Sequence, residues 1–205
     1  MNIATMCQEI KAEIKARICN ENCDKSFAGI VGAVYPELVM LGKGSFGAAF
    51  LHEEDHSKVY RISFSPQFDN WFKVAQFAME TGSEYFTRVF EMDTTEAMVG
   101  IAVIERLQRM PDVYHHLFLP YQSAMNTRCD IEFEAYRLAN NKIGFTMDHH
   151  VELMKLKQHL SGTNIKFRWD LFSRNFMLRG DPLAVCLLAH QLLAGNLDPL
   201  LSKPL

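Results

Sequence analysis

The sequence lacks the features that mark several classes of protein. It has no long basic run, and 21 Lys and Arg against 24 Asp and Glu give a formal net charge of −3, which argues against non-specific nucleic-acid binding. Its five cysteines are an odd number without the paired spacing of a zinc site, so we expect reduced thiols. The first twenty residues mix charge with apolar character, so we expect neither a signal peptide nor a membrane span. No repeat or low-complexity segment is present. These absences predict a soluble, cytoplasmic protein.

The chain has enough apolar residues for a sizeable interior. Hydrophobic residues make up 48% of its 205 residues, which suits one domain or two small lobes that share a core. Apolar residues recur at close to helical spacing from Ile3 to Ile18, which predicts an amphipathic helix. A short second helix is expected over Ser26 to Val34, and Pro36 breaks the chain before the next element.

The segment from Val39 to Ser63 organises the rest of the chain. Its pattern is strand, glycine loop, strand, polar turn, strand, with Gly42, Gly44 and Gly47 in a G-x-G-x-x-G arrangement. Glycines at this spacing let a backbone close over phosphates, although a plain hairpin turn has the same composition. A Rossmann loop needs a helix at its last glycine, whereas here an apolar strand follows. The hairpin form is typical of the loop over the nucleotide in protein kinases.

The remaining elements follow in a definite order. Asp69 is a candidate N-cap for a helix that Gly82 closes, and two further strands are expected over Arg88 to Met92 and Met98 to Ile104. Three helices are then predicted, over Val113 to Met125, Cys129 to Ala139 and His149 to Leu160. We therefore divide the chain into a helical extension (1–36), a sheet lobe (37–107) and a small helical lobe (108–205).

A second constellation lies near the end of the chain. Asp170 precedes Asn175 by five residues, and the apolar run that follows leads into a Gly-Asp-Pro turn and a returning strand over Leu183 to Leu188. In a phosphotransferase, such an aspartate orients the attacking hydroxyl and such an asparagine holds magnesium against the phosphates. Taken singly, each residue also fits a plain turn or loop role. Downstream of a glycine-loop hairpin and a sheet lobe, the phosphotransferase interpretation is favoured.

These stretches resemble the early serine/threonine protein kinases of podophages of the T-seven type. The resemblance spans Val39 to roughly His190, and the matching segments are LGKGSFGAAF, SKVYRISF, DNWFKVAQFA, RVFEM, VIERL and WDLFSRNFMLRGDPLAV. It implies an α+β fold of the two-lobed, protein-kinase-like type. The N-lobe would hold a five-stranded antiparallel sheet with one helix, the C-lobe would be small and helical, and the N-terminal helices would be an addition.

The resemblance also implies a site for ATP and magnesium. Gly42, Gly44, Ser45 and Gly47 would cover the phosphates, and Arg61 holds the third-strand position of the phosphate-pairing cation. Glu105 to Leu107 would form the hinge beside the adenine. Asp170 would be the catalytic acid, and Asn175 a catalytic-loop residue and metal ligand.

Three departures from the family pattern bear on activity. Arg61 replaces a lysine, and a guanidinium is not interchangeable with an ammonium at a tight phosphate site; a solvent-facing role for Arg61 is the plain alternative. No acid stands among Cys186 to His190, where a second metal-binding aspartate is expected, and Phe172 and Arg174 replace small residues.

Two interpretations of function therefore stay open. The favoured one is a catalytically impaired, kinase-like protein that binds a host protein and inhibits or redirects it. The other is an active minimal serine/threonine kinase that transfers the ATP γ-phosphate to itself or to host proteins. The sequence leaves the oligomeric state open.

Other candidate sites are weaker. The cluster of Asp148, His149, His150 and Glu152 suggests a metal, but the spacing differs from that of a zinc helix, and a solvated helix face is the favoured interpretation. The segment from Phe118 to Tyr121 is either an exposed patch for a partner or, as we favour, a helix–helix contact. Core positions are expected for Trp71, Phe72 and Phe77.

Overall fold

The fold is α+β and divides into two compact units. The first unit comprises Met1–Phe72 and Arg88–Arg106, and the second comprises Lys73–Thr87 and Leu107–Leu205. The computed structural model describes residues 2–18, 24–44, 46–96, 98–127, 129–141, 143–162, 167–169, 176–179, 184–187 and 193–195, with the backbone alone at 167–168, 184–187 and 193–195.

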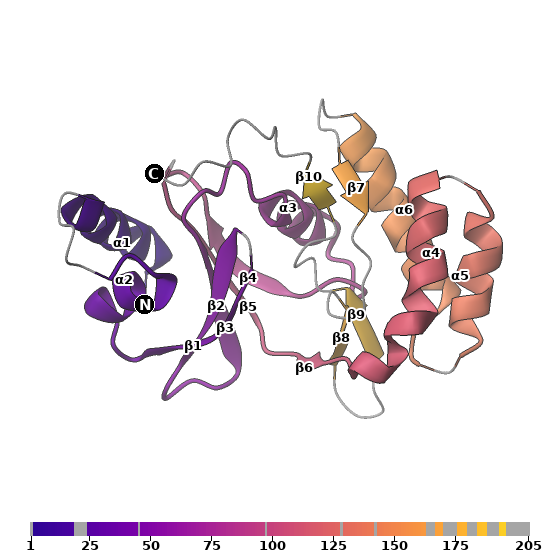
Figure 1. Cartoon of the computed structure of the whole chain (residues 1–205), viewed down its shortest axis with the longest axis horizontal. Coiled ribbons are helices and arrows are strands. Elements are labelled where there is room, and N and C mark those ends of the chain that lie inside the picture. Colours follow the sequence, from indigo (N-terminus) through magenta and orange to yellow (C-terminus); the bar gives the residue numbers. More distant parts are fainter. Residues whose placement is uncertain are drawn as a thin grey trace. The chain divides into compact units, whose positions relative to one another are not determined.

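A five-stranded antiparallel sheet forms the centre of the first unit (Figure 1), as the sequence predicts. Its strands pair in the order β1-β2-β3-β5-β4. Both edge strands contain an irregularity in register, between Met40 and Gly42 in β1 and between Val89 and Glu91 in β4. Such bulges weaken an edge as a template for further strand pairing. The strands are β1 (Leu38–Lys43), β2 (Gly47–His52), β3 (Lys58–Ser63), β4 (Val89–Asp93) and β5 (Gly100–Glu105).

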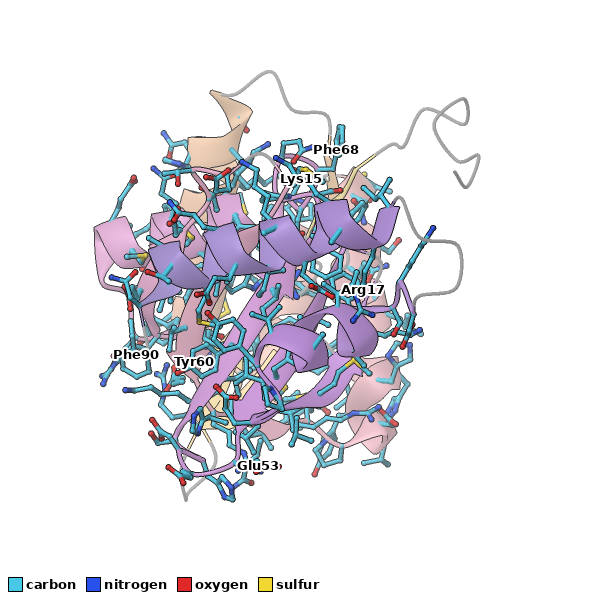
Figure 2. The ribbon with its side chains drawn as sticks, turned by 90° about the vertical axis from the view of Figure 1, so that its left-hand side faces the viewer. Lys15, Arg17, Glu53, Tyr60, Phe68 and Phe90 are labelled. Atoms are coloured by element: carbon cyan, nitrogen blue, oxygen red, sulfur yellow. The ribbon has the colours of Figure 1, made fainter. Side chains whose placement is uncertain are left out.

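Two N-terminal helices, α1 (Ile3–Ile18) and α2 (Phe27–Val34), cover one face of this sheet (Figures 1 and 2). Ile10 of α1 and Val31 of α2 are fully buried in the same apolar core as Phe50 of β2. Ser26 begins α2, where its side chain accepts a hydrogen bond from the backbone of Gly29. Because helices and sheet share one core, the N-terminal extension is an integral part of this unit.

Cys7 of α1 lies in this core and is fully buried. Burial, together with the nearby carboxylates of Asp93 and Glu96, raises the pKa of its thiol to about 12. Cys129, in contrast, is an exposed free thiol. The two residues provide an internal comparison, since the thiolate and not the thiol is the nucleophile.

We expect iodoacetamide at pH 8 to alkylate Cys129 at least roughly a hundred times faster than Cys7 in the folded protein, because Cys7 is both inaccessible and protonated. Site-resolved mass spectrometry of tryptic peptides measures both rates. The same measurement in urea is the control, since unfolding brings the rates together. Equal rates in the folded protein would show that α1 does not pack on the sheet as described.

Helix α3 (Trp71–Thr81) follows β3, and its sequence signals act as predicted. Asp69 accepts a hydrogen bond from the backbone N–H of Trp71 at 3.1 Å, and Gly82 ends the helix in the left-handed conformation at φ 60°. Trp71, Phe72 and Phe77 are each 5% exposed or less, which confirms their core positions.

The second unit is mainly helical. The three predicted helices are confirmed as α4 (His115–Thr127), α5 (Ile131–Ala139) and α6 (Met147–Ser161), and the predicted hairpin as β8 (Phe176–Arg179) and β9 (Ala184–Leu187). The short elements β6 (Gln108–Arg109), η1 (Asp112–Tyr114), β7 (Phe167–Trp169) and β10 (Leu193–Gly195) were not predicted, because two or three residues carry too little pattern. In the part of the chain that the structure describes, no helix is long and apolar enough to cross a membrane.

An aromatic core holds this unit together. The ring of Phe118 stacks on that of Phe176 at 4.2 Å between centroids, and Phe145 contacts both edge-on. Tyr121 is also fully buried. The Phe118–Tyr121 segment is thus a buried packing surface at these two positions, as favoured from the sequence, although Leu119 between them is 43% exposed.

The interpretation of His149 and Glu152 as a solvated helix face is wrong. His149 and His150 are each 3% exposed and Glu152 is 9% exposed. The His149 ring stacks on Phe145, and His150 Nδ1 lies 2.9 Å from the Tyr121 hydroxyl. Imidazole rings pack well against aromatic rings while their nitrogens find polar partners, so their polarity in the sequence does not reveal which way they face.

Candidate functional site

The glycine loop connects β1 to β2 in the first unit. The backbone N–H of Gly44 donates to the carbonyl oxygen of Gly47 at 2.7 Å, which closes the loop. A Cβ built on Gly47 would lie 2.9 Å from the Ile62 carbonyl oxygen and 3.3 Å from Arg61 Cζ, whereas one on Gly42 would meet nothing within 4 Å. Gly47 is therefore required by packing inside the sheet, while the space beside Gly42 is open.

Arg61 projects from β3 on the face opposite the α1–α2 core. Its sequence neighbours Tyr60 and Ile62 belong to that core, and successive side chains of a strand point to opposite faces. The cross-strand partners of Arg61 are Ala49 on β2 and Ala102 on β5. Two small neighbours leave room for a guanidinium to lie against the sheet.

The Arg61 side chain is buried in an ion pair. It is only 2% exposed, and Arg61 Nη2 donates to Asp69 Oδ2 at 2.7 Å. The Trp71 ring centroid lies 4.9 Å from Arg61 Cζ, within range of a cation–π contact. The plain alternative from the sequence, an Arg61 side chain that faces solvent, is therefore wrong.

The electrostatics of this pair follow from its burial. Desolvation lowers the pKa of Arg61, and the Asp69 carboxylate counteracts that shift by its charge and its hydrogen bond. Asp69 uses both carboxylate oxygens inside the protein, one for the Arg61 guanidinium and one for the Trp71 backbone N–H. The positive charge at the third-strand position is therefore neutralised by a neighbouring residue of the same unit.

The predicted hinge residues lie at the boundary between the units. Glu105, the last residue of β5, accepts a hydrogen bond from the Arg88 backbone N–H at 2.6 Å through its side chain. Its own backbone N–H donates to the Arg88 carbonyl at 3.0 Å, which extends the β4–β5 pairing by one step. Leu107 belongs to the second unit. Glu105 thus has a defined structural role at the end of the sheet.

The residues predicted for catalysis and metal binding, Asp170 and Asn175, lie outside the described residues, as do Ser45, Phe172 and Arg174. The positions that flank the segment 170–175 are described, and α4 holds both of them. The Asn126 side chain accepts from the Trp169 backbone N–H at 2.8 Å and donates to its carbonyl at 3.0 Å, while Phe118 stacks on Phe176. Sequence reasoning did not find Asn126, because an amide in a helix gives no signal of a distant backbone partner.

The described residues do not supply a magnesium site. Among them, no group of three or more His, Cys, Asp or Glu is arranged to hold a metal ion, and this includes the cluster around His149. The cation expected to pair with phosphate is already engaged by Asp69. Asp170 and Asn175, the residues that the resemblance implies at the metal, lie outside the described part of the chain.

No family model matches the sequence, and no curated protein matches it. Among solved structures, the chain is similar to the kinase PK-1 of Cydia pomonella granulovirus, at 12% identity and a TM-score of 0.39, over 76% of this chain and 55% of that one. It is also similar to Rad53 residues 1–466 in complex with AMP-PNP, at 13% identity and a TM-score of 0.38, over 75% of this chain and 38% of that one. The chain spans about half of the first structure and less of the second.

Proposed function

We propose that this protein is a kinase-like scaffold that does not transfer phosphate and that acts by binding a host protein, which it inhibits or redirects. The observation that carries the proposal is the buried pair of Arg61 and Asp69, with Nη2 and Oδ2 2.7 Å apart. A phosphate clamp needs a preorganised cation that faces the transferred group. In protein kinases the cation of this strand pairs with a helix carboxylate and contacts the phosphates at the same time. The Arg61 side chain, in contrast, is only 2% exposed, with Asp69 and the Trp71 ring against it, so a phosphate would have to displace the groups that bury it.

The rest of the first unit supports a binding role. Its sheet is covered on one face by α1 and α2, and the apolar core that they share is continuous. The fold is thus maintained by packing that does not depend on a nucleotide. The resemblance to phage kinases is the reason to propose a host protein as the target. It makes a host enzyme or defence complex the expected class of partner.

The nucleotide test separates this proposal from catalysis. We expect the melting temperature to stay unchanged within about 1 °C when millimolar ATP and magnesium are added, because a ligand that does not bind the folded state cannot stabilise it. Differential scanning fluorimetry with magnesium alone is the reference. A clear rise with ATP that Gly44→Asp abolishes would establish a nucleotide site and overturn this part of the proposal.

Phosphotransfer is the second arm of the same test. With labelled ATP, we expect no transfer to the protein itself or to host extract, and recovery of one stoichiometric host protein on affinity capture. Transfer that Asp170→Ala stops, without any captured partner, would instead establish the kinase.

The alternative function, an active minimal serine/threonine kinase, has one observation in its favour. Val39 and Leu41 of β1 are 49% and 51% exposed immediately before the glycine loop, and the space beside Gly42 is open. Exposed apolar side chains at this position suit contact with a planar base. For this alternative to hold, the groups that bury Arg61 must move aside so that a phosphate reaches it, or another cation must replace it.

A further inference from the structure

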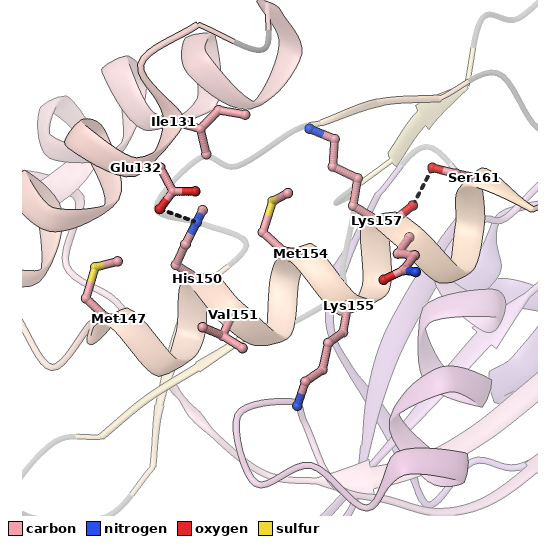
Figure 3. A pocket seen from close by; sticks show the side chains of 10 residues that line it. Ile131, Glu132, Met147, His150, Val151, Met154, Lys155, Lys157 and Ser161 are labelled. Atoms are coloured by element: carbon pink, nitrogen blue, oxygen red, sulfur yellow. Dashed lines mark hydrogen bonds and ion pairs between the residues drawn. The ribbon is translucent and has the colours of Figure 1, made fainter.

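A groove runs along the surface of the second unit between α5 and α6 (Figure 3). Its volume is about 710 Å³, and its walls carry both apolar and charged side chains. Ile131 and Glu132 at the start of α5 form one wall, and α6 supplies the remaining lining residues. Nothing in the kinase-like interpretation assigns a role to this groove.

The residues that α6 contributes have the spacing of a coiled-coil seam. Met147, Val151, Met154, Gln158 and Ser161 follow one another at intervals of four, three, four and three residues, and all five line the groove. Intervals of this kind place side chains at the a and d positions of a heptad, the stripe that packs against a second helix. The first three are apolar, and Val151 is 47% exposed.

The opposite face of α6 is already used. Leu153, Leu156 and Leu160 are 0–1% exposed and pack inside the unit. Helix α6 therefore carries an inward stripe that its own unit buries and a second stripe, in the groove, without a covering element among the described residues. A helix with apolar stripes on two sides is expected to be covered on both.

The lysines beside the seam favour negatively charged side chains in a helix that binds in the groove. Lys155 and Lys157 take the flanking e and g positions next to Met154, and the Lys155 side chain is 59% exposed. Lys155 pairs with Glu152 at 2.6 Å, and Lys157 Nζ lies 3.4 Å from the Met125 carbonyl oxygen. Both cations thus lie at the α6 edge of the groove, whereas the α5 wall carries the carboxylate of Glu132, whose side chain is 86% exposed. Carboxylates at the flanking positions of a helix docked along α6 would complement the two lysines.

The floor of the groove contains His150, which contacts residues of two neighbouring helices. His150 Nδ1 lies 2.9 Å from the buried Tyr121 hydroxyl, and His150 Nε2 lies 3.9 Å from the Glu132 carboxylate. Burial, with a smaller effect of Lys157, lowers the pKa of His150 against the opposing effect of Glu132. A floor that is already formed reduces the conformational entropy that is lost when a ligand binds in the groove.

We propose that the α5–α6 groove is the docking surface for an amphipathic helix of the partner protein, with apolar residues at heptad spacing and Asp or Glu at the flanking positions. This inference rests on the proposed binding function and deepens it by naming the surface and the chemistry of the partner. Methionine side chains suit such a role, because they adapt their shape to different apolar surfaces.

A designed peptide tests the chemistry directly. The probe is a fluorescein-labelled helix of three heptads with Leu at a and d and Glu at e and g, and the reference is a scrambled peptide of the same composition. With the full chain, we expect saturable binding of the probe alone in fluorescence anisotropy. Val151→Glu should weaken it roughly tenfold or more, because it places a charge in the apolar seam. Leu119→Glu on α4, at a position 43% exposed and outside the groove, is the matched control and should leave the affinity unchanged.

A charge exchange tests the predicted sign. Lys155→Glu should weaken binding of the Glu-flanked probe and strengthen binding of the same peptide with Lys at e and g. Circular dichroism of each variant shows that it is folded. Equal binding of the scrambled peptide, or no effect of Val151→Glu, would overturn the proposal. These readouts are independent of the nucleotide assays, so a failure here is distinguishable from a failure of the non-catalytic proposal.

Two further measurements test whether something other than a partner protein occupies the groove. Self-association in analytical ultracentrifugation that Val151→Glu abolishes would identify a second copy of this chain as the occupant. A marked gain in probe affinity after deletion of residues 196–205 would identify the chain's own terminal segment. Either result overturns the assignment of the groove to a separate partner protein.

Discussion

Replacement of Asp69 by alanine is expected to destabilise the first unit by about 3–5 kcal/mol. The substitution leaves the Arg61 guanidinium, 2% exposed, without its carboxylate, and it removes the hydrogen bond that Asp69 accepts from the Trp71 backbone at the start of α3. Urea unfolding followed by Trp71 fluorescence in a Trp169→Phe background reports on this unit, because the Trp71 ring lies directly over Arg61.

The matched control is Lys58, which lies in the same strand as Arg61, β3. Lys58→Ala removes a surface cation whose Nζ is 3.7 Å from Asp55 Oδ2, with both side chains 43% exposed, and we expect a loss of no more than about 1 kcal/mol. The double variant Arg61→Met/Asp69→Leu should recover much of the loss, since a buried ion pair is often replaceable by apolar groups of similar volume. If Asp69→Ala and Lys58→Ala cost the same, Arg61 is not held in a buried pair and is available as a phosphate ligand.

Replacement of Phe118 by alanine is expected to destabilise the second unit by about 3–5 kcal/mol. Phe118 is fully buried, stacks on Phe176 at 4.2 Å and contacts Phe145 edge-on, so its loss leaves a cavity among aromatic rings. Trp169 fluorescence in a Trp71→Phe background follows unfolding of this unit, since Asn126 of the same helix fixes the Trp169 backbone.

The neighbouring residue supplies the control for this prediction. Leu119 follows Phe118 in α4 but is 43% exposed, so Leu119→Ala should change the stability by less than about 1 kcal/mol. A large effect at both positions would place a covering element over Leu119. A small effect at both would show that α4 does not pack on β8 through Phe118 and Phe176.

The two predictions concern residues that lie next to the positions predicted for the site. The Arg61–Asp69 pair is a buried structural element of the sheet unit at the position that the resemblance assigns to a phosphate ligand. Helix α4 performs a comparable task in the second unit through Asn126 and Phe118. In both units, residues next to the positions predicted for the site make contacts that stabilise the fold.

Sequence alone determined most of the secondary structure and the α+β class. The helical period from Ile3 to Ile18, the alternation of apolar residues on either side of the glycine loop, and the capping residues Asp69 and Gly82 are local signals. Each depends on the conformational preferences of a few neighbouring residues, so it can be recognised without knowing how the rest of the chain folds. Hairpins between neighbours in the sequence account for the pairings β1–β2, β2–β3 and β4–β5, whereas the pairing of β3 with β5 spans α3 and β4 and is a tertiary contact.

Only the tertiary structure decided what the polar residues do. Arg61 meets Asp69, His149 and Glu152 turn into the unit, and Asn126 bonds a backbone 43 residues away. A buried polar group needs a partner at hydrogen-bond distance, and that partner is set by packing between elements rather than by spacing along the chain. The sequence therefore located the glycine loop and its cation, but the fold decided that the cation is already paired.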